Sequence, residues 1–181
     1  KTGESERKYS LFNQALKNAI DVIDQSFKRD GKIAGLPTGL RDLDKKLGGF
    51  HNSDLIIIAG RPSMGKTALG TNIAFNAAKK FKEEEDENGN KILIDGGKVA
   101  FFSLEMSSEQ LAQRILSEQA AIDSHKLRRG EIENNEFSKL VSIQNEIQNL
   151  PFFIDDTPAL SVSQIASRAR RLKRTEGLKL I

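Results

Sequence analysis

The sequence predicts an α/β fold in which helices flank a largely parallel sheet. Four short apolar runs alternate with longer segments whose apolar residues recur every three or four positions, which is the pattern of strands alternating with amphipathic helices. A helix between successive strands is the connection that parallel pairing requires. The expected strands lie at residues 55–59, 99–104, 152–155 and 178–181.

Composition narrows the classes of protein to consider. The chain has 181 residues, a length that fits one domain with a substantial core. Its formal net charge of +3 is too small to indicate a nucleic-acid partner, and the lack of cysteine excludes a disulfide scaffold or thiolate metal site. Two histidines, His51 and His125, are too few for a histidine-rich metal centre. No apolar run approaches the roughly 20 residues that span a bilayer, and no signal peptide opens the chain, so we expect a cytoplasmic protein without a membrane partner.

The first expected element is an amphipathic helix over residues 5–27. Its apolar stripe repeats at intervals of three and four and consists of Phe12, Leu16, Ala19, Ile23 and Phe27. A polar, glycine-bearing link follows this helix. We therefore divide the chain into a helix with its tether, residues 1–35, and a main domain, residues 36–181.

A short helix, a buried strand and a longer helix come next. Thr38 is a suitable N-cap for the short helix, which Gly48 and Gly49 end. The strand at residues 55–59 is continuously apolar and β-branched, as strands buried on both faces are. A glycine-bounded loop joins it to a helix over residues 66–81.

Residues 82–97 differ in character from the segments around them. A block of five acidic residues precedes the turn signal Asn88-Gly89-Asn90. We interpret this stretch as a surface excursion with a small hairpin, and we favour a solvated acidic loop over a contact site.

The second half of the chain continues the alternation of strand and helix. A capping box of Ser107 with Gln110 opens a helix that runs to about residue 121, and a second box of Ser161 with Gln164 opens the last helix. Between these helices the sequence predicts a short basic turn, another helix and the third strand, at residues 125–130, 133–148 and 152–155.

The strongest functional signal is a full match to the phosphate-loop pattern, Gly60-Arg61-Pro62-Ser63-Met64-Gly65-Lys66-Thr67. Gly60 and Gly65 allow the backbone to turn tightly and aim N–H groups at a polyphosphate, and the following helix adds the positive end of its dipole. Lys66 can bridge the β- and γ-phosphates, and the Thr67 hydroxyl can hold Mg²⁺. The strand before the loop and the helix after it favour nucleotide binding over a loop that only turns the chain.

A second candidate is Glu105, which directly follows the expected strand at residues 99–104. A carboxylate just past the carboxyl end of a strand lies in the crevice where α/β sheets bind ligands. There it can orient and deprotonate the water that attacks the γ-phosphate. Spacing alone leaves an equal alternative, in which the charge only favours the N-terminus of the next helix.

The remaining polar candidates favour structural roles. Asp155 and Asp156 could reach the same crevice, but acidic residues before Pro158 are typical turn formers. A basic face on the last helix could bind a phosphate backbone, although a solvated face is the better interpretation. This face consists of Arg168, Arg170, Arg171, Lys173 and Arg174.

Five segments resemble, in this order, those of bacterial replicative DNA helicases of the DnaB type. Their positions here are residues 37–44, 48–50, 60–67, 103–107 and 153–158. The resemblance extends over nearly the whole chain from about residue 10. The loop at residues 60–67 and the segment Ser103-Leu104-Glu105-Met106-Ser107 are specific to that family, whereas the earlier stretch is shared among RecA-like ATPases.

The resemblance implies a RecA-like P-loop NTPase motor in a ring-shaped homohexamer that uses ATP and Mg²⁺ to move along single-stranded DNA. It implies that Lys66 and Thr67 act as phosphate-loop residues and that Glu105 is the catalytic base. The helix at residues 10–27 is similar to the linker helix that docks on the neighbouring subunit of such rings. A primase and a helicase loader are the implied protein partners.

The sequence departs from the family in two places. Residues 82–97 are longer than the family's usual turn. The chain also stops as the family's next strand begins, before the second acidic motif, the DNA-binding loops and the arginine finger. We therefore expect the isolated chain to be a poor or inactive motor.

Two other functions remain open from the sequence. A RecA-like recombinase or repair ATPase would share the loop and Glu105 but would exchange strands in filaments. A nucleotide-switched assembly module would bind ATP without using it as fuel.

Overall fold

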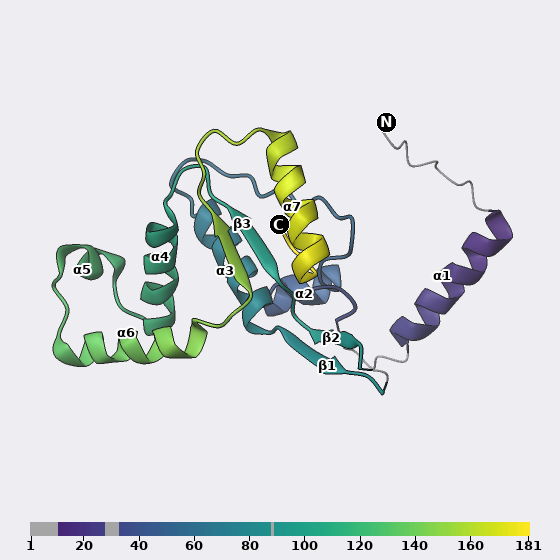
Figure 1. Ribbon diagram of the computed structural model, residues 1–181, viewed down its shortest axis with the longest axis horizontal. Coiled ribbons are helices and arrows are strands. Elements are labelled where there is room, and N and C mark those ends of the chain that lie inside the picture. Colours follow the sequence, from purple (N-terminus) through teal and green to yellow (C-terminus); the bar gives the residue numbers. More distant parts are fainter. Residues whose placement is uncertain (1–10, 28–32, 88) are drawn as a thin grey trace. The chain divides into compact units, whose positions relative to one another are not determined.

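Figure 1 shows the computed structural model, which describes residues 11–27, 33–87 and 89–181. The chain divides into two units, Lys1–Ala34 and Gly35–Ile181. The first contains the helix α1 (Phe12–Phe27), and the second contains the sheet and the remaining described helices.

The helix α1 carries an exposed apolar stripe. The predicted helix is confirmed from Phe12 onward, while its expected start at residues 5–10 lies outside the described residues, as does the side chain of Phe27. Phe12, Leu16 and Ile23 are 77%, 49% and 61% exposed. A single helix offers no second layer against which to bury such a stripe.

The centre of the second unit is a parallel pair of strands, β3 (Val99–Phe102) and β4 (Phe152–Asp155), with Val99 opposite Phe152. The strand β4 has the predicted bounds, β3 ends two residues before the predicted end at residue 104, and the parallel pairing expected from alternating strands and helices is confirmed. The central residues Val99 and Ala100 are almost completely buried.

Helices cover both faces of this pair (Figure 1). The helix α3 (Lys66–Lys79) packs a row of alanines against Val99. The helix α7 (Val162–Glu176) packs Ala169 against Ala100. Because successive strand residues point to opposite faces, the two helices lie on opposite sides of the sheet and form the outer layers of an α/β/α arrangement.

The last residues extend the sheet by a single parallel bridge. Leu180 bridges to Val99, and the Ala100 N–H donates to the Leu180 carbonyl at 3.0 Å. The direction of the predicted fourth strand is thus confirmed, but its length is one bridge rather than residues 178–181.

The prediction of a buried strand at residues 55–59 is wrong for this chain. Leu55 and Ile57 are 86% and 79% exposed, and the segment contributes no strand among the described residues. A strand is stabilised by hydrogen bonds to a neighbouring strand, and no described strand pairs with this segment. The local sequence therefore favours a strand at residues 55–59, but no described strand lies beside it to pair with.

The predicted hairpin at residues 82–97 is confirmed. Strands β1 (Lys82–Glu85) and β2 (Lys91–Asp95) pair antiparallel, and the Asp86 carboxylate accepts from the Asn90 N–H at 2.7 Å across the turn. The acidic block therefore lies on a two-stranded projection.

Both predicted capping boxes are present. Ser107 with Gln110 opens α4 (Ser108–Ala120), and Ser161 with Gln164 opens α7. The expected basic turn is the short helix α5 (Ser124–Arg129), which Gly130 ends, and α6 (Asn134–Ile147) matches the predicted helix after it. No helix in the described ranges is both long and apolar enough to cross a membrane.

Thr38 does not cap the short helix as predicted. The helix α2 (Arg41–Leu47) begins after Leu40, without a side-chain cap, and ends at the left-handed Gly48 as expected. The Thr38 hydroxyl instead donates to the buried Asp44 carboxylate at 2.6 Å. The hydroxyl therefore pairs with a residue six positions along the chain and does not cap the helix.

Candidate nucleotide-binding site

The loop at residues 60–67 turns the chain sharply into α3. Ser63 and Gly65 have φ angles of 63° and 84°, both in the left-handed region that favours glycine. Gly65 directly precedes α3 and meets this requirement at no steric cost, whereas Ser63 adopts the conformation with a side chain present. Two such residues close together bring successive backbone N–H groups toward one side of the loop.

The N-terminus of α3 has no capping side chain. The first helical hydrogen bond runs from the Leu69 N–H to the Gly65 carbonyl at 2.9 Å, so the N–H groups before Leu69 have no partner within the helix. Uncapped N–H groups and the helix dipole together attract anions. The start of α3 is therefore suited to a phosphate group.

The Lys66 side chain crosses the loop. Its ammonium donates to the Arg61 carbonyl at 3.2 Å, and its stem passes Gly60, where an added Cβ would lie 3.6 Å from the Lys66 Cγ. The side chains of the loop residues are exposed, with Met64 at 74%. The loop therefore presents a cation and free N–H groups to solvent.

Glu105 lies in a turn between β3 and α4. The Ser103 hydroxyl donates to the Met106 carbonyl at 2.6 Å and accepts from the Met106 N–H at 3.2 Å, which closes the turn around Glu105. The Glu105 carboxylate is exposed and has no hydrogen-bond partner in the part of the chain that the structure describes. Hydrogen bonds therefore hold the backbone of this turn, whereas none among the described residues holds the Glu105 carboxylate.

The loop and Glu105 lie at the same edge of the sheet. The Gly97 N–H donates to the Ala77 carbonyl at 3.0 Å, which joins the last turn of α3 to the start of β3. Ala74 and Ala78 of α3 pack against Val99 at the start of β3, Phe75 packs against Phe101 further along the strand, and α3 spans about 20 Å. The start of α3 and the end of β3 are therefore at the opposite, shared edge.

Asp155 and Asp156 have the structural roles that the sequence favours. Asp155 accepts from the Thr157 N–H at 3.1 Å, as in a turn, and the Thr157 hydroxyl and the Arg168 guanidinium hold the pKa of its carboxyl below the usual value. Asp156 accepts from the Ser108 N–H at 2.7 Å at the start of α4, which lowers its pKa.

Sequence reasoning missed a buried polar network behind the loop helix. The Asp44 carboxylate, 4% exposed, accepts from the Thr38 N–H and hydroxyl and from the Gly39 N–H. From α3, the Asn76 amide donates to the Thr38 carbonyl at 3.2 Å. This network ties the segment before α2 to the helix that the loop opens.

The two histidines have only local surroundings in the part of the chain that the structure describes. The His51 N–H donates to the Asp54 carboxylate, and His125 lies in the first turn of α5. Within residues 11–27, 33–87 and 89–181, no group of three or more histidine, cysteine or acidic side chains is placed to hold a metal ion.

A phosphate-loop sequence that opens a helix packed on a parallel sheet defines the α/β class of P-loop NTPases. Residues 35–181 match the family described as the DnaB-like helicase C terminal domain. The chain belongs to this family, as its five motifs indicate.

Relatives with curated names cover the whole chain. "Replicative DNA helicase DnaB" of Rickettsia prowazekii (strain Madrid E) is 45% identical over 181 residues, which are 100% of this chain and 36% of that protein. The protein of the same name from Geobacillus stearothermophilus is 41% identical over 184 residues, 98% of this chain and 37% of that protein. The chain thus spans only 36% to 37% of the length of these relatives.

Two solved structures share the fold. One, described as an ATPase domain, aligns with a TM-score of 0.76 at 28% identity, over 96% of this chain and 56% of that one. A DnaB-like replicative helicase, described together with its interactions with primase, aligns with a TM-score of 0.73 at 27% identity, over 98% and 39% of the two chains. The RecA-like α/β fold implied by the motifs is therefore confirmed.

Proposed function

We propose that the second unit is part of the ATP-driven motor of a replicative DNA helicase, which moves along single-stranded DNA and opens the duplex. The observation that carries this proposal is the uncapped start of α3 behind the loop at residues 60–67, with the Lys66 side chain across that loop. The relatives named as replicative DNA helicases support the choice of reaction.

The loop residues bind the nucleotide. The N–H groups at the start of α3 donate to phosphate oxygens of ATP, and the Lys66 ammonium exchanges the Arg61 carbonyl for the β- and γ-phosphates. The left-handed conformation at Gly65 keeps the backbone close to the phosphates. ATP supplies the phosphoryl bond whose hydrolysis drives movement.

The start of α3 also fits a magnesium ion that arrives with the nucleotide. Mg²⁺ keeps several waters and binds through one or two protein oxygens plus substrate phosphates, not through an all-protein cage. Thr67 offers one exposed hydroxyl at this place, next to Lys66. We assign the protein ligand of Mg²⁺ to Thr67.

Glu105 is the general base in this proposal. Its carboxylate follows β3 at the edge where α3 begins, and in this proposal it faces the γ-phosphate. There it orients the attacking water and takes its proton. Ser103 is a positioning residue, because its hydroxyl closes the turn that carries Glu105.

The exposed stripe of α1 supports assembly into a ring. We propose that residues 1–35 act as a linker helix and tether, and that the stripe docks on a neighbouring copy in a homohexamer around single-stranded DNA. A primase and a helicase loader are the proposed partners of the complete protein, which would act in a bacterial-type cytoplasm. The solved DnaB-like helicase described with primase supports the first of them.

The deciding experiment is ATP-driven unwinding of a forked duplex by the full-length protein, with Glu105→Gln beside it. We expect the wild-type protein to unwind and the variant to bind nucleotide without unwinding. Ser103→Ala should lower the rate of hydrolysis while leaving the affinity for ATP unchanged, because Ser103 acts through Glu105.

Two results would replace this proposal. Hydrolysis stimulated by single strands without duplex opening would favour a recombinase or repair ATPase. Full function of Glu105→Gln would favour a module that ATP only switches between assembly states.

A further inference from the structure

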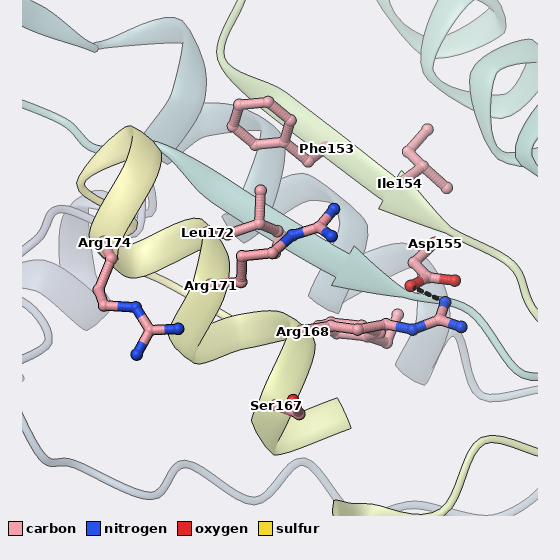
Figure 2. A pocket seen from close by; sticks show the side chains of 10 residues that line it. Phe153, Ile154, Asp155, Ser167, Arg168, Arg171, Leu172 and Arg174 are labelled. Carbon is pink, nitrogen blue, oxygen red and sulfur yellow. Dashed lines mark hydrogen bonds and ion pairs between the residues drawn. The ribbon is translucent and has the colours of Figure 1, made fainter. Parts of the chain in front are cut away.

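We infer that the groove between α7 and the sheet is a docking site for an extended, acidic and apolar peptide segment of a partner protein. The groove has a volume of about 610 Å³, within the range of ligand sites. Figure 2 shows Phe153 and Leu172 on its inner side, with Arg171 extending from α7 across the groove.

The positive charge of the groove favours an anionic ligand. Arg168 is already neutralised, because its guanidinium pairs with the Asp155 carboxylate at 2.5 Å and donates to the Thr157 hydroxyl at 2.8 Å. Arg171 and Arg174 also line the groove, and neither pairs with an acidic side chain in the described ranges. Asp155 is the only acidic residue of the lining. Two guanidinium groups therefore remain for carboxylates, which they can bind bidentately.

The apolar inner surface of the groove favours a ligand that also carries apolar side chains. It is lined by Ala100, Phe102, Phe153 and Leu172. Both phenylalanines are half-buried in the domain, so their rings do not form an open platform for stacked bases. A phosphate backbone would use the arginines and leave this apolar surface uncovered. A peptide that carries both acidic and apolar residues would use both.

The free edge of β4 favours an extended peptide. The Ser103 N–H donates to the Asp155 carbonyl and the Val99 N–H donates to the Pro151 carbonyl, so the odd-numbered residues of β4 face β3. The backbone of Ile154 faces the other way, and in the described part of the chain no strand pairs with that edge. Unpaired backbone groups beside a lined groove are the arrangement used in β-strand addition.

The test is binding of a fluorescein-labelled peptide of Glu-Glu-Leu-Leu repeats to the full-length protein without nucleotide, followed by fluorescence anisotropy. In an extended chain each face of this peptide carries both residue types. The double variant Arg171→Glu/Arg174→Glu should weaken binding by about tenfold or more. The matched control Arg128→Glu/Arg170→Glu reverses the charge at two exposed positions that do not line the groove. It should change the affinity for the peptide by less than about twofold.

A second probe tests the strand edge without changing the protein. The same peptide with an N-methyl group on every residue has no backbone N–H left for the ladder, whichever edge it presents to β4, and we expect its binding to be lost. No binding of the parent peptide with the protein in 100-fold excess over the peptide, equal loss in both double variants, or unchanged binding of the methylated peptide would each overturn the inference. An oligothymidylate whose affinity falls with Arg171→Glu/Arg174→Glu while the peptide's affinity does not would reassign the groove to nucleic acid.

Discussion

Lys66 is the residue whose role depends most directly on geometry. Because its ammonium already reaches across the loop to the Arg61 carbonyl, Lys66→Ala should remove the cation from the phosphate site without disturbing α3. We expect the affinity for a fluorescent ATP analogue to fall on the order of 100-fold. Lys79→Ala, at the far end of the same helix, is the control and should bind like the wild type. Unchanged affinity of Lys66→Ala would refute the loop assignment.

Asp44 is the residue on which the buried network depends. Asp44→Ala leaves the Thr38 and Gly39 N–H groups without their acceptor, so we expect the free energy of unfolding to fall by about 2–4 kcal/mol. Asp42→Ala removes an exposed carboxylate from the same helix and should cost less than about 1 kcal/mol. Urea denaturation of both variants measures the difference, and equal effects would contradict the network's importance.

Asp155 makes stability depend on pH. Its folded-state pKa is lowered by the Thr157 hydroxyl and the Arg168 guanidinium, so its stabilising contribution is present above the unfolded pKa of about 4 and is lost as the pH falls through the folded value. Asp155→Asn should therefore lower the Tm at neutral pH, and the gap to the wild type should shrink on acidification toward pH 3. A gap that stays constant between about pH 7 and pH 3 would exclude the carboxylate as its source.

Individual residues differ in how far the sequence reveals them. The loop at residues 60–67 is recognisable because its chemistry lies within one contiguous segment. The roles of Thr38 and Asn76 are not, because their contact joins positions 38 residues apart and depends on how α3 packs. Ser103 lies between these cases, since a hydroxyl at the end of a strand is a local signal for a turn, whereas its contact with Met106 is visible only in the structure.

At the scale of elements, helix starts are encoded locally and can be tested locally. Ser107 accepts from the Gln110 N–H at 3.3 Å and begins α4 immediately after the turn that carries Glu105. Ser107→Ala should lower the free energy of unfolding by about 1 kcal/mol. Ser142→Ala, within α6, is the matched control and should have no destabilising effect. Chemical denaturation gives both values, and equal values would show that the cap contributes nothing.

The difference between local patterns and long-range pairing explains which elements the sequence predicts correctly. The strand β4, the hairpin and both capping boxes follow from nearest-neighbour patterns and lie where expected. The apolar run at residues 55–59 has an equally strong pattern but forms no strand, because pairing depends on a partner far along the chain. Strand propensity and strand formation are different properties.

At the scale of the whole second unit, protection of amides against hydrogen exchange should be strongest in the layers around β3. Amides of Val99 and Ala100 are enclosed between α3 and α7, whereas Leu55 and Ile57 are largely exposed. Hydrogen exchange followed by mass spectrometry of this chain should therefore show residues 55–59 exchanging at least about 100-fold faster than residues 99–102. Similar protection of both segments would mean that residues 55–59 are paired in solution.

The exposed run also has a consequence for handling the protein. Leu55-Ile56-Ile57-Ile58 combines high β-propensity and no charge with open backbone groups, which is the composition of segments that stack between molecules. Concentrated samples of the 181-residue chain should therefore aggregate and become turbid over hours, and Ile57→Lys should delay this turbidity. The shelf life of the purified chain would then be limited by four consecutive aliphatic residues next to the phosphate loop.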